Sequence, residues 1–298
     1  MTGVGVVEVV EVPSNLGLLP HGVELAPAAL RAAGLARRLG ARRVREVPCP
    51  AHDPVRDEET GLLNPGGIVV VSTRLADTIE EALDDGAFPV VVGGDCSILV
   101  GSMLALRRRG RYGLLHVDGH ADFWHPSQEP IGEAASLDLA LVTGRGPALI
   151  TDIEGRTPLA RDEDIAHVGY ASVVNDHHLD RHIRDTAITV LDLSDVRRRG
   201  MQGCITDALA VVARPELDGV WLHLDVDVLD DDLMPAVDYR EPDGLTWEEV
   251  EHIIAATVRT GRLVGLQVTI YNPSLDGPGA PLAARIVDLL ADGLDAGL

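Results

Sequence analysis

Short apolar runs that alternate with longer amphipathic stretches are the feature that most constrains the fold of this chain. The runs at residues 88–92 and 113–117 are mostly apolar, which is typical of strands that are buried on both faces. The stretches at residues 73–87 and 97–109 have helical periodicity, and the second ends in three arginines, which suit the negative end of a helix dipole. This alternation predicts an α/β fold in which helices cover both faces of a parallel sheet.

The rest of the chain follows the same alternation. A further helix is predicted at residues 26–39, and further strands at residues 5–12, 188–191, 220–228 and 263–271. Neither an internal repeat nor a linker interrupts the 298 residues, so we predict one domain over residues 1–298. The longest irregular part, residues 122–161, predicts loops over a site. The histidine-rich stretch at residues 175–182 is expected to be a solvated loop or the start of a helix.

The charge balance limits the partners that this chain can bind. It has 47 acidic and 25 basic residues, a formal net charge of −22, and every basic residue is an arginine. Such a chain does not attract nucleic-acid phosphates or anionic lipids, and an aromatic content of 3% offers few side chains for stacking bases. Metal ions and guanidinium-like small molecules remain suitable partners, whereas the lack of lysine excludes Schiff-base chemistry.

The cysteines and the N-terminal residues predict a cytoplasmic protein. Cys49, Cys96 and Cys204 are an odd and small number of cysteines, which argues against a disulfide framework and for a reducing compartment. The first residues include acidic side chains and no basic segment, unlike a secretory signal. No apolar run reaches the 18 residues that would indicate a membrane span.

Three strand-to-loop junctions carry residue types that bind metal ions. Ligands of a parallel α/β sheet bind beyond the carboxyl ends of its strands, so these junctions are the first places to search for a site. The segments are GGDCS at residues 93–97, DGHAD at residues 118–122 and DVDVLD at residues 225–230. Each segment alone would also fit a surface turn or a helix cap, but their occurrence at three strand ends favours a metal site.

The spacing within these segments places their ligands together. Residues i, i+2 and i+4 of an extended chain share one side, so Asp118, His120 and Asp122 converge, as do Asp225 and Asp227. Four carboxylates and one imidazole would be unstable together unless cations neutralised them. These ligands suit Mn²⁺ or a similar divalent ion, and five or six of them are enough for two metals that convert water into hydroxide.

In these three segments, and in their order, the chain resembles the ureohydrolase family of arginases, agmatinases and formimidoylglutamases. GGDCS corresponds to the family's GGDHS, DGHAD to DAHxD, and residues 224–237 (LDVDVLDDDLMPAV) to DxDxxDPxxxP. Residues 22–30 (GVELAPAAL) resemble a further family pattern, and the resemblance covers nearly the whole chain. It implies a three-layer α/β/α fold with a mainly parallel sheet of about eight strands, and a homo-oligomer, either a trimer or a hexamer.

The resemblance also implies a di-manganese centre that hydrolyses a carbon–nitrogen bond of a linear guanidine or amidine. A metal-activated hydroxide would attack the substrate carbon, and Asp122 would orient it and pass a proton to the leaving amine. Asp122 and His120 are therefore the predicted catalytic residues. Matched by position, the predicted metal ligands are Cys96, Asp118, His120, Asp122, Asp225 and Asp227.

The first departure from the family pattern is Cys96, which takes the place of the first metal's histidine. A thiolate is softer and more negative than an imidazole. Cys96 is therefore either a ligand or a small buried thiol beside a single metal. We expect two Mn²⁺ ions per chain, or one if Cys96 binds none.

The second departure concerns the family's HGMP segment, whose histidine shuttles protons or contacts the substrate. Residues 135–138 read ASLD here, so no imidazole stands at this place. His125, in a nearby loop, is the histidine predicted to reach the substrate. His116 is expected to be a core residue of its strand.

The third departure lies in the family's ExNP segment, which reads IYNP at residues 270–273. The glutamate that pairs with the guanidinium is replaced by Ile270, and an apolar side chain cannot replace a bidentate ion pair. Asn272 is retained and is predicted to contact the substrate. The candidates for a compensating acid, each expected to face solvent, are Glu129, Glu133, Asp138, Glu241 and Asp243; Asp138 and Asp243 are the two predicted to contact the substrate.

These observations predict a metal-dependent hydrolase of a guanidino or amidino compound other than plain L-arginine. One alternative is an Nω-hydroxyarginine-type hydrolase, since such members carry cysteine at the place of Cys96 and resemble residues 242–244 (PDG). The other alternative is a non-catalytic metal-binding regulatory or assembly protein, which would explain the loss of three family residues. However, four clustered carboxylates would destabilise a protein that no longer bound metal.

Overall fold

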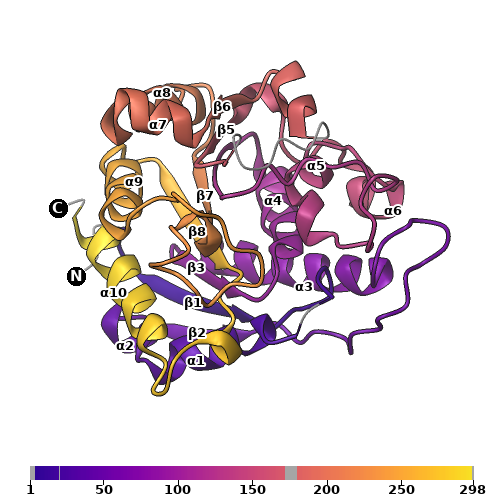
Figure 1. Ribbon diagram of the computed structural model, residues 1–298, viewed down its shortest axis with the longest axis horizontal. Coiled ribbons are helices and arrows are strands. Elements are labelled where there is room, and N and C mark those ends of the chain that lie inside the picture. The colour runs from indigo at the N-terminus through magenta and orange to yellow at the C-terminus, as the bar shows by residue number, and fades with distance from the viewer. Residues whose placement is uncertain (1–3, 20, 172–179, 297–298) are drawn as a thin grey trace.

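Eight parallel strands form one continuous sheet (Figure 1). The computed structural model describes residues 4–19, 21–171 and 180–296, so residues 175–179 of the histidine-rich stretch lie outside the described residues. In spatial order the strands are β2 (Arg43–Glu46), β1 (Val7–Val12), β3 (Phe88–Gly93), β8 (Leu263–Thr269), β7 (Val220–Asp225), β4 (Gly113–Val117), β5 (Ile165–Val168) and β6 (Thr189–Leu191). The predicted parallel α/β sheet is confirmed.

Helices cover both faces of the sheet and complete three layers (Figure 1). One layer contains α1 (Ala26–Ala32), α2 (Leu35–Arg38), α7 (Leu193–Arg199), α8 (Met201–Val212), α9 (Trp247–Arg259) and α10 (Pro281–Asp295). The other layer contains α3 (Pro65–Asp84), α4 (Leu99–Arg109), α5 (Asp138–Val142) and α6 (Ala148–Thr151). Among the described residues, no helix has the length and apolar character needed to cross a bilayer.

Local backbone chemistry explains where the structure differs from the sequence-based elements. The single helix predicted at residues 26–39 is two helices, because Gly34 adopts a left-handed conformation with φ of +93° after α1 ends. Strand β2 carries no apolar run, since its sequence is RVRE and it lies largely exposed at the sheet edge. Helices α5 and α6 lie within the part that was predicted to form loops.

A buried glutamate on β1 is paired with arginines that follow α2. Glu8 has no exposed surface, and its Oε1 accepts a hydrogen bond from Arg42 Nη2 at 2.5 Å while Oε2 accepts one from Arg45 Nε at 3.0 Å. Burial alone would raise the pKa of Glu8, but the hydrogen bond from Arg42 and the charges of the neighbouring arginines outweigh it, so the pKa lies below its ordinary value. This carboxylate therefore stabilises the fold in its ionised form.

Glu8→Gln is expected to lower the free energy of unfolding by about 1–2 kcal/mol at neutral pH, less than for a fully buried pair because the Arg42 side chain is 41% exposed. Because the folded-state pKa is depressed, this contribution is present above about pH 4.5 and is lost as the pH falls through the folded-state pKa. Urea unfolding at several pH values should therefore show the wild-type and variant stabilities converging in acid. Glu46→Gln, at a side chain 60% exposed, is the control. A constant difference down to pH 3 would contradict this account.

Candidate metal centre and substrate pocket

The carboxyl ends of four adjacent strands, β3, β8, β7 and β4, meet at one place in the centre of the sheet. Cys96 follows β3, Asp118 follows β4, Asp225 ends β7 and Ile270 follows β8, and all four are buried. Cys96 Sγ donates a hydrogen bond to Asp225 Oδ2 at 2.8 Å, across 129 residues of sequence. The strand order thus brings the three predicted segments into one cluster.

A close backbone approach fixes the turn that carries Cys96. A Cβ atom on Gly94 would lie 1.7 Å from the carbonyl oxygen of Ser14, so only glycine fits there. Ser14 Oγ donates to Asp95 Oδ2 at 2.8 Å, and Asp95 Oδ1 accepts from the backbone N–H of Ser97 at 2.9 Å. The second bond caps the short 3₁₀ helix η2 (Cys96–Ile98), so the side chain of Cys96 has a fixed place beside Asp225.

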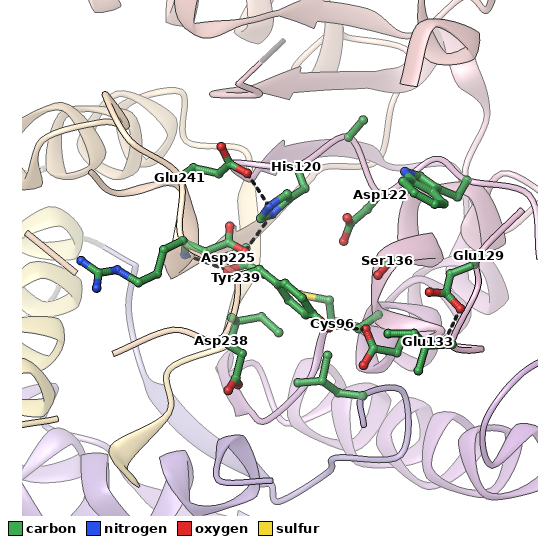
Figure 2. Close-up of a pocket in the computed structure, with 18 of the residues that line it drawn as sticks. Cys96, His120, Asp122, Glu129, Glu133, Ser136, Asp225, Asp238, Tyr239 and Glu241 are labelled. Atoms are coloured by element: carbon green, nitrogen blue, oxygen red, sulfur yellow. Dashed lines mark hydrogen bonds and ion pairs between the residues drawn. The ribbon is translucent and has the colours of Figure 1, made fainter. Parts of the chain in front are cut away.

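His120 is held by carboxylates at both of its ring nitrogens. Its Nδ1 lies 3.0 Å from Asp227 Oδ2 and 3.9 Å from Asp118 Oδ1, and its Nε2 lies 3.1 Å from Glu241 Oε1 (Figure 2). Histidines that bind metals are usually oriented by a carboxylate or carbonyl on the other ring nitrogen. Glu241 therefore fits as the orienting partner, and Nδ1 fits as the ligand atom.

One hydrogen bond shapes the DVDVLD segment, and a second joins it to the DGHAD segment. Asp225 Oδ1 accepts from the backbone N–H of Asp227 at 2.8 Å, which caps the 3₁₀ helix η7 (Val226–Val228). Asp227 Oδ1 accepts from the backbone N–H of Gly119 at 3.2 Å. Asp122 is half-buried, has a φ of +44°, a left-handed conformation that aspartate tolerates better than most residues, and lines the same pocket.

Burial dominates the protonation of this cluster. Burial, followed by the negative charge of Asp227, raises the pKa values of Asp118 and Asp225 well above their ordinary value. Burial and then the charge of Asp225 raise the pKa of the Cys96 thiol in the same way. For His120, burial lowers the pKa, but the charge and hydrogen bond of Asp227 outweigh it and raise the pKa. Without a cation, burial and mutual repulsion thus favour the protonated acids, and a divalent cation would stabilise their ionised forms.

The ligand atoms fit a divalent metal. They form groups whose atoms lie within 4.8 Å of one another, and Asp118 Oδ2 has no hydrogen-bond partner within the described part of the chain. Carboxylate oxygens with imidazole nitrogens suit Mn²⁺ and Zn²⁺. The groups around the predicted ligands are Asp118, His120 and Asp227; Cys96, Asp118, His223 and Asp225; and Cys96, Asp122 and Asp138.

A pocket of about 440 Å³ opens onto this cluster. Figure 2 shows its acidic side chains around the space that His120 and Asp122 face. Its apolar wall includes Leu18, Ala135 and Ile270. The acids that line it away from the DGHAD and DVDVLD segments are Glu129, Glu133, Asp238 and Glu241. An acidic pocket of this size suits a small cationic molecule.

The expectation that the candidate compensating acids face solvent is wrong for four of the five. Glu129, Glu133, Asp138 and Glu241 are between 0% and 7% exposed, whereas Asp243 is exposed. Hydrogen bonds offset the burial of Glu133, which accepts from the backbone N–H of Leu19 at 2.8 Å and from Tyr239 Oη at 2.9 Å. Burial also raises the pKa of Glu133.

The predictions that His125 and Asp243 contact the substrate do not agree with where the structure places them. His125 is exposed, and its Nδ1 lies 2.8 Å from Ser127 Oγ. Asp243 is exposed as well, and it has a φ of +60° in the turn before α9. Neither residue belongs to the pocket lining. Their positions in the sequence, close to the ligand segments, predicted that both residues lie near the site. The sequence did not reveal that their loops turn these side chains towards solvent.

Asp138 and Asn272 also lie outside the pocket lining, for a different reason. Asp138 is fully buried, with Oδ1 3.3 Å from Nε2 of His116. Asn272 donates to both carboxylate oxygens of Asp238 at 3.1 Å, so it can act on the pocket only through Asp238. His116 is a fully buried residue of β4, as predicted.

Sequence reasoning did not find Asp238, Tyr239 or His223. Asp238 and Tyr239 follow the DVDVLD segment and line the pocket, but no spacing marks them. For His223 a signal was present, because it stands two residues before Asp225 on a strand and so shares its side.

Comparison with known proteins agrees with this geometry. Residues 6–291 match the family model described as Arginase family. The chain is 28% identical to an arginase of Staphylococcus aureus (strain COL), over 93% of each chain. The native structure of arginase from Bacillus caldovelox superposes with a TM-score of 0.88 at 26% identity, covering 99% of this chain and 98% of that one. A formimidoylglutamase from Bacillus subtilis shares the fold, with a TM-score of 0.78 at 17% identity, covering 98% of this chain and 87% of that one.

The three-layer fold with its single sheet of parallel strands is that of a ureohydrolase. The chain belongs to the arginase family. It is accordingly a hydrolase that acts on guanidino or amidino carbon–nitrogen bonds, which are not peptide bonds.

Proposed function

We propose that this hydrolase is metal-dependent and acts on a linear guanidino or amidino compound other than plain L-arginine. The observation that carries the proposal is the pocket, with the ligand cluster at its base and four further acids around it. The acids suit a cation of the guanidinium or amidinium type. Ile270 stands in the wall where the family resemblance implies a glutamate, so the usual ion pair with L-arginine is missing.

The proximity of the predicted ligand residues to one another supports this function. We propose that Asp118, His120 and Asp227 hold one Mn²⁺ ion, and that Asp122 and Asp225 offer further oxygens. Cys96 would join the ligands only as a thiolate, which its burial opposes. When bound, the metal supplies the Lewis acidity that activates a water molecule for attack on the substrate carbon.

Side chains of this protein would transfer the proton, orient His120 and limit the access of water. Asp122 lines the pocket, where its carboxylate would take a proton from the attacking water and pass it to the leaving amine. Glu241 orients the ring of His120 through Nε2. Leu18, Ala135 and Ile270 form the apolar side of the pocket and limit its access to water.

Neither alternative is favoured. The prediction of an Nω-hydroxyarginine-type hydrolase is based on Cys96 and on residues 242–244. Asp243, the middle residue of that segment, does not line the pocket. A non-catalytic binding protein would have no need of a pocket above the ligands. The prediction of a homo-oligomer and that of a cytoplasmic location stay predictions of the sequence.

The test is to purify the protein with Mn²⁺, measure bound metal per chain, and assay release of urea or ammonia. The panel should hold L-arginine, its Nω-hydroxy derivative, decarboxylated and chain-shortened guanidino compounds, and formimino compounds. We expect one compound to exceed L-arginine at least tenfold in kcat/KM. Activity should be lost on chelation and restored by Mn²⁺. L-Arginine as the best substrate would contradict the proposed specificity. Bound metal without hydrolysis of any compound would favour the binding-protein alternative.

A further inference from the structure

Asp138 is a buried carboxylate that the pocket does not use. It is the first residue of α5, has no exposed surface and lies outside the pocket lining. Its Oδ2 atom has no hydrogen-bond partner among the described residues, and none of the arginines described there forms an ion pair with it. A buried carboxylate without a cation is costly, so this residue needs a separate explanation.

Three histidines beside Asp138 form an inner row across the sheet. His167 on β5, His116 on β4 and His223 on β7 are paired in register on neighbouring strands, and all three are fully buried. Burial lowers the pKa of each imidazole, that of His116 to about 3, so the rings are neutral. This inner row of histidines therefore does not supply the positive charge that Asp138 lacks.

The neutral rings instead hold Asp138 in place. The amide Nε2 of Gln267 donates to His223 Nδ1 at 2.7 Å, so the proton of His223 is on Nε2, which faces Asp138 Oδ2 at 3.6 Å. His116 Nε2 lies 3.3 Å from Asp138 Oδ1, and its Nδ1 lies 2.9 Å from Nδ1 of His167. An N–H group directed at a carboxylate favours its ionised form and fixes its orientation.

Asp138 lies close to two of the predicted metal ligands. One ligand atom each of Cys96, Asp122 and Asp138 lies within 4.8 Å of the other two. Bonds of about 2.0–2.3 Å place opposite ligand atoms of one ion up to about 4.5 Å apart, so small movements would bring these three atoms around a single ion. The group proposed above for one Mn²⁺ ion shares no residue with this one, so the two groups can hold two ions.

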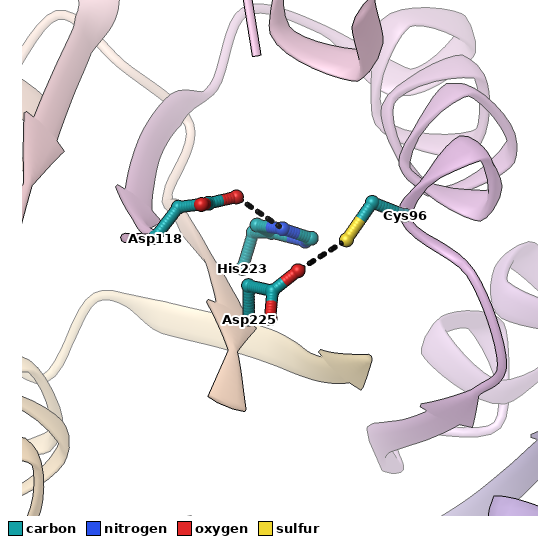
Figure 3. A group of neighbouring side chains, drawn as sticks. All are labelled: Cys96, Asp118, His223 and Asp225. Atoms are coloured by element: carbon teal, nitrogen blue, oxygen red, sulfur yellow. Dashed lines mark hydrogen bonds and ion pairs between the residues drawn. The ribbon is translucent and has the colours of Figure 1, made fainter. Parts of the chain in front are cut away.

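Cys96 can join this group as a thiolate once a metal ion binds. Its Sγ donates to Asp225 Oδ2 at 2.8 Å, and Figure 3 shows these two side chains turned towards each other beside His223 and Asp118. Metal binding to a cysteine releases the thiol proton, so the ion would overcome the burial that opposes the thiolate. Asp225 already accepts this proton and lines the pocket, through which the proton can leave to solvent.

We infer that Asp138 is a metal ligand and that it forms, with Cys96 and Asp122, a second metal site of this chain. Asp138 supplies the additional ligand where a sulfur stands in place of the family's imidazole. One thiolate and two carboxylates suit Zn²⁺ or Co²⁺ better than Mn²⁺, because the thiolate is a soft ligand. The second site does not depend on which compound the protein hydrolyses.

The test loads the full-length protein with Co²⁺ and measures bound cobalt per chain by elemental analysis. We expect two equivalents in the wild type and one in Asp138→Asn and in Cys96→Ala, which remove ligands of the second site alone. Glu133→Gln neutralises another buried acid outside both groups, so it is the matched control and should keep two. A single equivalent in the wild type, or two equivalents in Asp138→Asn, would overturn the inference.

His116→Gln tests whether the inner row of histidines positions Asp138. We expect the Kd of the second cobalt equivalent to rise by about 10- to 100-fold, the effect usual for residues that orient a metal ligand. The Kd of the first equivalent should stay the same, because His116 does not belong to either group of ligands that hold the two ions. Titration with Co²⁺ measures both constants, and an unchanged second Kd would contradict the positioning role.

X-ray absorption of the cobalt-loaded wild type decides the matter even if a buried variant fails to fold. We expect a sulfur neighbour at about 2.3 Å, the distance typical of a thiolate ligand, in addition to nitrogen and oxygen. Two equivalents with only nitrogen and oxygen neighbours would overturn the second site. A sulfur neighbour and the loss of one equivalent in Asp138→Asn, without hydrolysis of any tested compound, would leave the second site standing while the proposed function failed.

Discussion

Asp227→Asn is expected to lower kcat/KM for the best substrate by more than about 100-fold, beyond the effect usual for residues that only orient a ligand. Asp227 lies 3.0 Å from His120 Nδ1 and accepts from the backbone N–H of Gly119, so it holds together the proposed ligand group of Asp118, His120 and Asp227. Asparagine keeps the shape and can still accept from Gly119, but it removes the negative charge. The measurements are steady-state kinetics in excess Mn²⁺ and metal content per chain.

Asp232→Asn is the matched control for this loss of charge. Asp232 follows the DVDVLD segment and its side chain is exposed, so its replacement should leave kcat/KM and metal content unchanged. Unfolding in urea should show that the metal-free Asp227→Asn protein is as stable as the metal-free wild type, because the substitution relieves repulsion among buried carboxylates. Undiminished activity in Asp227→Asn would remove Asp227 from the catalytic centre.

Ile270→Glu is expected to raise kcat/KM for L-arginine by about 10- to 100-fold relative to Ile270→Gln, since a hydrogen bond to a charged group is worth about 1.5–3 kcal/mol. Ile270 lines the pocket, and its backbone is held by a hydrogen bond from its N–H to the carbonyl of Gly94 at 2.8 Å. Glutamate at this place would offer two oxygens to a guanidinium group. The measurement is urea release from L-arginine over a range of concentrations.

The glutamine variant separates charge from shape. Both substitutions remove a β-branched side chain from a backbone with φ of +70°, where such residues are strained, so both should relieve this strain to a similar degree. Equal kcat/KM values for the two variants would mean that the pocket does not present position 270 to the guanidinium group. The proposal that Ile270 sets the specificity would then be wrong.

The acids around the pocket show how this chain could bind a cation without that glutamate. Glu133 is held by Leu19 and Tyr239, and Asp238 by Asn272, so these carboxylates keep fixed places beside the apolar wall. They lie on segments other than the three that carry the predicted ligands.

The sequence by itself determined the sheet and the location of the ligand cluster. Apolar runs such as β3 and β7 are buried on both faces, and this local property is visible in the residues. Asp118, His120 and Asp122, like Asp225 and Asp227, are close in sequence and follow strand ends, so their proximity was visible in the residues. The backbone there is not extended as predicted, because Asp227 lies in η7 and Asp122 has a left-handed conformation. Polar segments such as β2 lack that signal, and the sequence-based elements do not include it.

The tertiary structure alone decided which distant residues meet. The burial of Glu133 and Glu241 depends on partners from distant segments, which no local pattern reveals. The meeting of His116 with His223 requires β4 to lie beside β7, although more than 100 residues separate these strands in sequence. Strand order is set by the packing of the whole sheet, so the pocket and the inner row of histidines became visible only in the folded chain.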